Sequence, residues 1–163
     1  METAVMLSIK PRWIELIAAF KKMLELRKSK PNLKTPFKCY IYCTKDRRGL
    51  EIEEDRDPTW LFGTDNDFGK VVGEFTCDYI ERYVTMYSSN YATFYMKEED
   101  GEILSSINFG ETCLTEDDFF AYGGGNDLFG WHISNLKIYS EPKLLADFGL
   151  TRAPQSWCYI RTA

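Results

Sequence analysis

Lys22-Met23-Leu24-Glu25-Leu26-Arg27 is the stretch that decides how the sequence is interpreted. From Leu24 onward apolar and charged side chains alternate, which is the period of a β-strand with one buried face. Glu25 and Arg27 therefore share the polar face of the predicted strand, and Lys22 stands shortly before it. The stretch thus places one carboxylate between two cations.

The segment before this stretch predicts a strand followed by a helix. Val5–Ile9 is a mainly apolar run without the signals of a helix, and Lys10-Pro11 begins a new element because proline suits the first turn of a helix. Apolar residues then follow at helical spacing and predict a single stripe that packs against the core. The stripe consists of Trp13, Leu16, Ile17 and Phe20.

The segments after the stretch predict further strands separated by long connections. Phe37–Cys43 is rich in aromatic and β-prone residues, and its alternate residues Cys39, Ile41 and Cys43 line one side. Residues 45–69 show no clear period and contain the acidic run Glu51–Asp57, so we expect a long excursion from the core. The other expected elements are strands at 69–80, 131–139 and 157–160, a hairpin of 93–96 with 103–109, and a helix capped by Thr115 and ended by Gly123–Gly125. Short strands, two helices and long connections favour a small mixed α+β barrel.

Composition places the chain among ordinary globular proteins. It has 163 residues, of which 44% are apolar and 28% charged, as expected for one domain spanning 1–163. No apolar run approaches the roughly 20 residues of a membrane-spanning helix. The first residues also lack the features of a signal peptide. We therefore expect a cytoplasmic protein without membrane contact.

Cysteine and histidine counts restrict the chemistry. Five cysteines are an odd number in a chain long enough to bury its own core, so we expect small buried side chains rather than a disulfide framework. His132 is the only histidine, which excludes most zinc sites and histidine-based triads. The carboxylates Asp65, Asp67 and Glu51–Asp57 would suit a metal, but a solvated acidic loop is the preferred interpretation. The sequence predicts no metal and no cofactor.

Charge is distributed unevenly along the chain. Residues 1–48 carry twelve Lys and Arg against four Asp and Glu, whereas residues 49–163 carry eight against twenty-one. Attraction to phosphate would come from the basic first third, because it depends on cations presented together. Pairing between the two parts of the chain is an equally acceptable explanation.

Several short motifs, in order, resemble the ASCH domain. The family signature is glycine, any residue, lysine, two residues, glutamate, any residue, arginine; Lys22, Glu25 and Arg27 match it, and Phe20 stands at the glycine position. The stretches that resemble this family are similar to those of ASCH proteins that are common in bacteriophages and their bacterial hosts. The other matching stretches are Leu7-Ser8-Ile9-Lys10-Pro11, Trp131-His132-Ile133-Ser134-Asn135-Leu136-Lys137 with Pro142, and Pro154-Gln155-Ser156-Trp157 with Tyr159-Ile160.

The resemblance implies a small PUA-like β-barrel flanked by helices, with a long insertion between the barrel strands. It also implies a cleft beside the first helix that binds RNA or a modified nucleotide. The trio Lys22, Glu25 and Arg27 either binds such a ligand or forms a buried charge network that fixes the turn. The candidate nucleic-acid-binding residues are Lys10, Arg12, Lys22, Glu25, Arg27 and Ser156, with Lys21, Lys28 and Gln155 as further contributors.

Two other functions remain open. Some ASCH-like proteins resemble an amidohydrolase acting on an acylated cytidine, and others are linked to RNA cleavage. Where that amidohydrolase has threonine this chain has Glu25, so a hydrolase here would use Glu25 as general base and Lys22 as its cationic partner. The third possibility is a protein partner bound by the acidic insert 45–69. The oligomeric state is not predicted.

Overall fold

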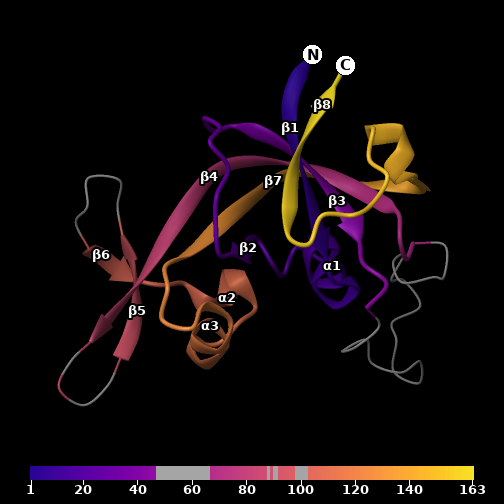
Figure 1. The fold of residues 1–163 in the computed structure, drawn as a ribbon. Helices are drawn as coiled ribbons and strands as arrows, with labels where there is room; N and C mark the ends of the chain where they lie inside the picture. Colours follow the sequence, from indigo (N-terminus) through magenta and orange to yellow (C-terminus); the bar gives the residue numbers. More distant parts are fainter. Residues whose placement is uncertain (47–66, 88, 90–91, 98–102) are drawn as a thin grey trace, which may run out of the picture.

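The computed structural model describes residues 1–46, 67–87, 89, 92–97 and 103–163. It is an α+β fold built on one mixed sheet (Figure 1). The strands are β1 (Glu2–Ile9), β2 (Leu24–Arg27), β3 (Phe37–Cys43), β4 (Val71–Tyr87), β5 (Ala92–Lys97), β6 (Ile103–Ser106), β7 (Leu128–Lys143) and β8 (Trp157–Thr162). The helices are α1 (Pro11–Ala18), α2 (Phe109–Thr112), α3 (Glu116–Gly123) and the 3-10 helix η1 (Leu145–Phe148).

The sheet curls strongly because its two longest strands are irregular. The strand order is β2-β7-β4-β3-β1-β8, and β5 and β6 extend from the far half of β4. The β4 and β7 ladder shifts register at three places, and such bulges increase the local twist. β1 pairs in parallel with β3 and antiparallel with β8, where Glu2 lies opposite Thr162. The two chain ends therefore lie side by side (Figure 1).

Side chains join the two ends of the sheet. β2 and β8 are the outermost strands of the order, and the Arg27 guanidinium on β2 donates hydrogen bonds to Ser156, next to β8, and to Ser8 on β1. Trp157 at the start of β8 donates its indole N–H to the Ser29 hydroxyl at 3.0 Å, just beyond β2. The sheet that was predicted as a barrel is therefore strongly curled but not closed by strand pairing, and side chains link its two outermost strands at this seam.

Alternate residues of the strands fill the concave interior. On β3 the inward residues are Phe37, Cys39, Ile41 and Cys43, which confirms the predicted side of that strand. Trp131 of β7 is fully buried among them, and α1 contributes Ile14 and Ile17. Burial raises the pKa of the Cys43 and Cys77 thiols to about 12. These cysteines are core side chains, as predicted.

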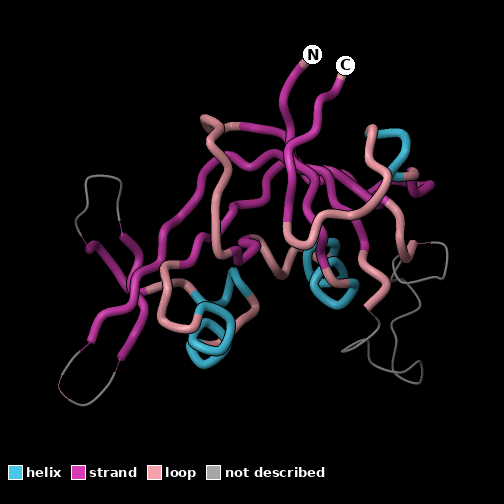
Figure 2. Tube along the Cα trace, in the orientation of Figure 1, coloured by secondary structure: helices cyan, strands magenta, loops and turns pink. Residues whose placement is uncertain are grey.

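A second apolar cluster lies under α2 and α3, where β4 and β7 extend beyond the curled part (Figure 2). Tyr83 of β4 is fully buried there and donates its hydroxyl to Glu81 at 2.6 Å. Its ring lies across the backbone of Gly130 on β7, where a Cβ atom would stand 2.8 Å from two ring carbons. The other cluster members are Leu26, Phe94, Ile107, Phe119 and Leu128.

The predicted apolar stripe of the first helix is wrong at Phe20. The helix ends at Ala18, and Phe20 lies beyond it with φ of +58° and 68% of its surface exposed. Phe20 occupies the position of the signature glycine, and it adopts the left-handed conformation that glycine adopts without steric cost. The chain thus makes the same turn with a side chain directed to solvent. Of the predicted stripe, Ile17 is buried and Trp13 and Leu16 are half-buried, whereas Ile14, which was not predicted, is also buried.

Other predicted elements are confirmed with changed bounds. Thr115 caps α3 in a reciprocal capping box with Asp118, and Gly124 ends the helix in the left-handed conformation. β5 and β6 pair as the predicted hairpin, whose turn lies outside the described residues. Residues 47–66 also lie outside the described residues. The predictions for the acidic insert, for a protein partner bound by it and for Asp65 therefore stay predictions. Within the described ranges, no helix is long and apolar enough to cross a membrane.

Candidate nucleic-acid-binding cavity

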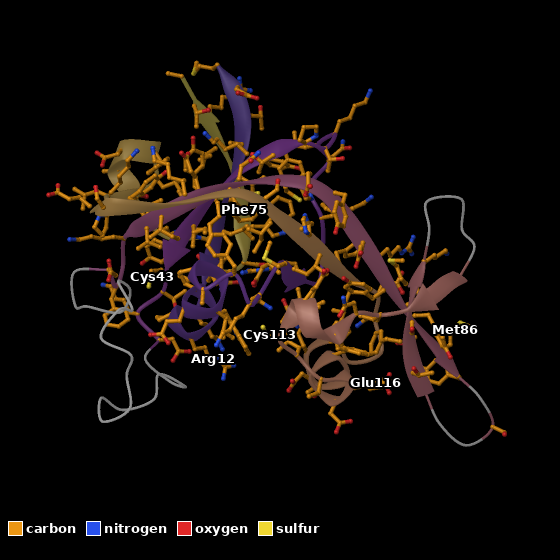
Figure 3. The ribbon with its side chains drawn as sticks, turned by 180° about the vertical axis from the view of Figure 1, so that it is seen from behind. Arg12, Cys43, Phe75, Met86, Cys113 and Glu116 are labelled. Carbon is orange, nitrogen blue, oxygen red and sulfur yellow. The ribbon has the colours of Figure 1, made fainter. Side chains whose placement is uncertain are left out.

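A cavity of about 740 Å³ opens between α1, β2 and α3. Its walls come from the end of β1, the first turn of α1, β2, the loop after β2, α3 and the residues preceding β8. Figure 3 shows Arg12 projecting from α1 on the side toward α2 and α3. All six predicted binding residues line this cavity: Lys10, Arg12, Lys22, Glu25, Arg27 and Ser156.

The pairing of β2 with β7 explains how the signature residues reach the cavity. Glu25 lies opposite Trp131 and Arg27 opposite Phe129, so their side chains share the face that β7 directs to the interior. Leu26 points to the other face and joins the cluster under α3. The alternation predicted from the sequence is confirmed, but its polar face is turned inward: Glu25 and Arg27 are only 5% and 7% exposed.

The hydrogen-bonding groups of Arg27 are largely occupied by the protein itself. One terminal nitrogen donates to the backbone and the hydroxyl of Ser156, each at 3.1 Å. The other donates to the Ser8 carbonyl at 2.8 Å and to Glu25 Oε1 at 3.0 Å. Only Nε is without a hydrogen-bond partner. Arg27 therefore holds the seam of the barrel, and its fork is not available to a phosphate in this arrangement.

Glu25 and Lys22 form the floor of the cavity. Glu25 Oε2 is buried without a hydrogen-bond partner and lies 3.9 Å from Lys22 Nζ. Lys22 is 2% exposed, donates to the Thr112 carbonyl and lies 5.1 Å from the centre of the Trp13 ring. Burial lowers the pKa of Lys22, and this effect outweighs the opposing attraction of Glu25.

Three further cations surround the mouth of the cavity. The Arg12 guanidinium stacks 4.3 Å from the centre of the Trp13 ring, and Lys28 Nζ lies 4.9 Å from that of Tyr122. Lys10 Nζ is 3.8 Å from an Asp46 carboxylate oxygen, at the outer limit of an ion pair, and its side chain is 46% exposed. In all, five cations and the two carboxylates Glu25 and Asp118 line the cavity.

Sequence reasoning missed the wall formed by α3. Asp118, Ala121 and Tyr122 lie more than 90 residues from β2, and no local pattern indicates that this helix covers the signature. Lys21 was expected at the rim of the cavity. It is exposed but lies outside the cavity lining, because it belongs to the turn between α1 and β2. Lys28 and Gln155 do line it.

The remaining candidates lie elsewhere. The Asp78 carboxylate accepts a hydrogen bond from His132 Nδ1 at 2.7 Å, and the His132 ring stacks on Tyr79 on the outer face. Trp131 is core and Trp157 packs against it. In the part of the chain that the structure describes, no three His, Cys, Asp or Glu side chains gather closely enough to hold a metal ion.

The curled sheet, with α1 and β2 bordering one cavity, forms an ASCH-like fold. The chain matches the crystal structure of ASCH from Zymomonas mobilis with a TM-score of 0.60 and 16% identity, over 98% of this chain and 88% of that one. It also matches two mutants of the same protein. The tyrosine-to-phenylalanine mutant matches with a TM-score of 0.59 and 16% identity, over 98% of this chain and 91% of that one. The serine-to-alanine mutant matches with a TM-score of 0.59 and 15% identity, over 98% of this chain and 89% of that one.

These structures confirm the fold predicted from the motifs. No protein-family model and no curated protein sequence matches the chain. Backbone arrangement therefore preserves a likeness that the sequence retains only in short stretches.

Proposed function

We propose that this protein binds RNA or a modified nucleotide in the cavity between α1, β2 and α3. The observation that carries the proposal is the concentration of charge at one hollow. Five of the twelve cations in the basic first third of the chain line the cavity, against two carboxylates. Cations presented together attract phosphate, and the low-dielectric walls of a cavity strengthen that attraction.

The shape of the cavity also supports this ligand class. Its volume lies within the range of small-molecule sites, about 300 to 1,000 Å³. Trp13 and Tyr122 supply aromatic surface in its walls, and unpaired bases are commonly held on such rings. Glu25 Oε2 and Arg27 Nε at the floor are an acceptor and a donor without partners in the protein. Small adjustments would let them meet the polar edge of a base.

Filling the cavity tests the proposal directly. Ala121 is an exposed residue of α3 in the cavity wall, so Ala121→Trp places a bulky side chain in the hollow without removing a charge. We expect the affinity for a fluorescein-labelled single-stranded RNA 12-mer of mixed sequence to fall by about tenfold or more, measured by fluorescence anisotropy at two salt concentrations.

The matched control is Ala146→Trp, the same substitution at an exposed position of η1, away from the cavity. It should bind the RNA as the unmodified protein does. Equal affinity in both variants would remove the cavity from the proposal, and absence of RNA binding by the unmodified protein would end it.

A hydrolase is a second candidate, favoured by the position of Glu25 Oε2. This oxygen has no hydrogen-bond partner and lies beside a lysine whose charge can stabilise developing negative charge. In such a reaction Glu25 would take a proton from a water molecule that attacks an amide of an acylated pyrimidine nucleoside, or from the attacking group in RNA cleavage. Lys22 would stabilise the resulting negative charge. Collapse of the intermediate would then break the C–N bond of the amide, or the P–O bond of the RNA, and Glu25 would return its proton to the leaving nitrogen or oxygen.

Turnover assays separate this candidate from simple binding. We expect Glu25→Gln to lower kcat on N4-acylated cytidine, or on RNA, by about a hundredfold or more, because the amide cannot accept the proton. Binding of the substrate should change far less. If the unmodified protein forms no product from either substrate, the hydrolase candidate is wrong and the binding proposal stands alone.

A further inference from the structure

The cations of the cavity fall into two groups that differ in how they are compensated. At the floor, Glu25 lies between Arg27 at 3.0 Å and Lys22 at 3.9 Å. The terminal nitrogens of Arg27 donate hydrogen bonds to Ser8, Ser156 and Glu25, and Lys22 donates to the Thr112 carbonyl. These groups are engaged in holding the barrel together, which makes them poor partners for a mobile anion.

The cations at the mouth are compensated differently. Arg12 and Lys28 each lie on an aromatic ring, Trp13 and Tyr122 respectively. A cation held on a ring is positioned but keeps its full charge, since the ring is neutral. Two carboxylates lie near the three cations of the mouth: Asp118, whose Oδ2 accepts the Thr115 N–H at 2.8 Å at the start of α3, and Asp46, which lies 3.8 Å from Lys10 Nζ. The mouth therefore carries excess positive charge.

The mouth, like the floor, holds a buried polar atom without a hydrogen-bond partner. Arg12 Nε is buried and has no hydrogen-bond partner. A buried donor without a partner is unfavourable, and an anion bound to the same guanidinium is one way to offset that cost. A phosphate group is well matched to a guanidinium, since two of its oxygens can accept a pair of parallel N–H hydrogen bonds from one edge of the planar guanidinium.

We propose that the mouth formed by Lys10, Arg12 and Lys28 is a phosphate subsite, so that the cavity selects a nucleotide or the phosphate-bearing end of an RNA over a neutral nucleoside. This inference rests on the proposed function and assigns its anion-binding residues. The nucleoside portion extends toward the floor of Glu25 and Lys22, while the phosphate remains at the rim beside the rings.

Comparison of nucleosides with their 5′-monophosphates tests the subsite. The probes are the four ribonucleosides, their monophosphates and inorganic phosphate, titrated by isothermal calorimetry at low salt and pH 7.5, where a phosphate monoester carries nearly two charges. For the base that binds best, we expect the monophosphate to bind about tenfold or more tightly than the nucleoside. Inorganic phosphate should compete at higher concentration.

Two variants locate the effect. Arg12→Gln and Lys28→Met each remove one charge from the mouth and should reduce the preference for the monophosphate by about threefold or more, while nucleoside affinity changes little. Lys21→Met is the matched control, because Lys21 is an exposed cation of the same region outside the cavity lining. Thermal unfolding shows whether each variant is folded. If Arg12→Gln does not fold, Lys28→Met still tests the subsite.

The outcomes separate this inference from the proposed function. If the unmodified protein binds RNA but binds nucleoside and monophosphate equally, or neither, the phosphate subsite is wrong and RNA binding stands. If Lys21→Met lowers the preference as much as the two mouth variants do, general surface charge explains it and the subsite is again wrong. If RNA, nucleosides and nucleotides all fail to bind, the proposed function fails as well.

Discussion

Replacing Arg27 with methionine is expected to lower the free energy of unfolding by about 3–5 kcal/mol, the usual consequence of removing one partner from a buried ion pair. The substitution leaves the Glu25 carboxylate buried with only Lys22, at 3.9 Å. It also removes the hydrogen bonds that join β2 to Ser8 and Ser156. Urea unfolding followed by tryptophan fluorescence measures this loss.

Arg82→Met is the matched control for that experiment. Arg82 pairs with Asp127 on the surface, with its Nε 2.9 Å from the carboxylate, and both side chains are well exposed. Exposed pairs contribute about 0–1 kcal/mol, so this variant should be nearly as stable as the unmodified protein.

A double variant tests whether the buried charge is the cause. Glu25→Gln removes the carboxylate that Arg27→Met leaves buried without its arginine partner. The loss in free energy of unfolding in the double variant should therefore be smaller than the sum of the two single losses. A loss of less than about 1 kcal/mol for Arg27→Met would mean that the seam is not held by this side chain.

The second large effect is expected at Gly130. In Gly130→Ala the new methyl group would stand 2.8 Å from two carbons of the Tyr83 ring and closer still to its hydroxyl. Tyr83 is fully buried and its hydroxyl is held by Glu81, so the ring cannot move away freely. Crowding of this kind is unfavourable by about 1–3 kcal/mol, and we expect the upper part of that range in the same urea measurement.

Gly110→Ala provides the control, because the methyl group would meet only the Asn108 side chain, at 3.2 Å. Its effect should stay below about 0.5 kcal/mol, as for ordinary surface substitutions. In a Tyr83→Phe background the nearest clashing atom is absent, so Gly130→Ala should lose less stability there. Equal losses in both backgrounds would contradict the role assigned to the Tyr83 hydroxyl.

The parts of the fold that follow a local period were predictable. β2 alternates apolar and charged residues, β3 is rich in aromatic and β-prone residues, and Thr115 with Asp118 forms a capping pattern that depends on four consecutive residues. The length of β4 was not predictable. Its second half, from Glu81, contains charged residues and is held in extended form by pairing with β7 on one side and β5 on the other. Such pairing is tertiary and leaves little trace in the local sequence.

The candidate site was predicted in membership but not in the roles of its members. The sequence pointed to six of the residues that line the cavity, yet two of the four hydrogen bonds of Arg27 go to backbone carbonyls, which every residue carries and which no pattern marks. Likewise, the contact between Lys28 and Tyr122 at the mouth could not be predicted, because it depends on how α3 folds back over β2. Residue types suggested the chemistry, but only their placement separates the cations that stabilise the barrel from those proposed to bind a ligand.

The pairing of Glu2 with Thr162 has a practical consequence for all of these measurements. Both chain ends leave the molecule together, and the cavity borders the opposite ends of the same two strands, at Ser8 and Ser156. Six residues of extended chain separate these positions, which amounts to about 20 Å. A purification tag, fluorophore or sensor-surface tether attached at either terminus therefore stands well away from the opening, and a short linker between the termini offers a route to a circularly permuted form with new ends elsewhere.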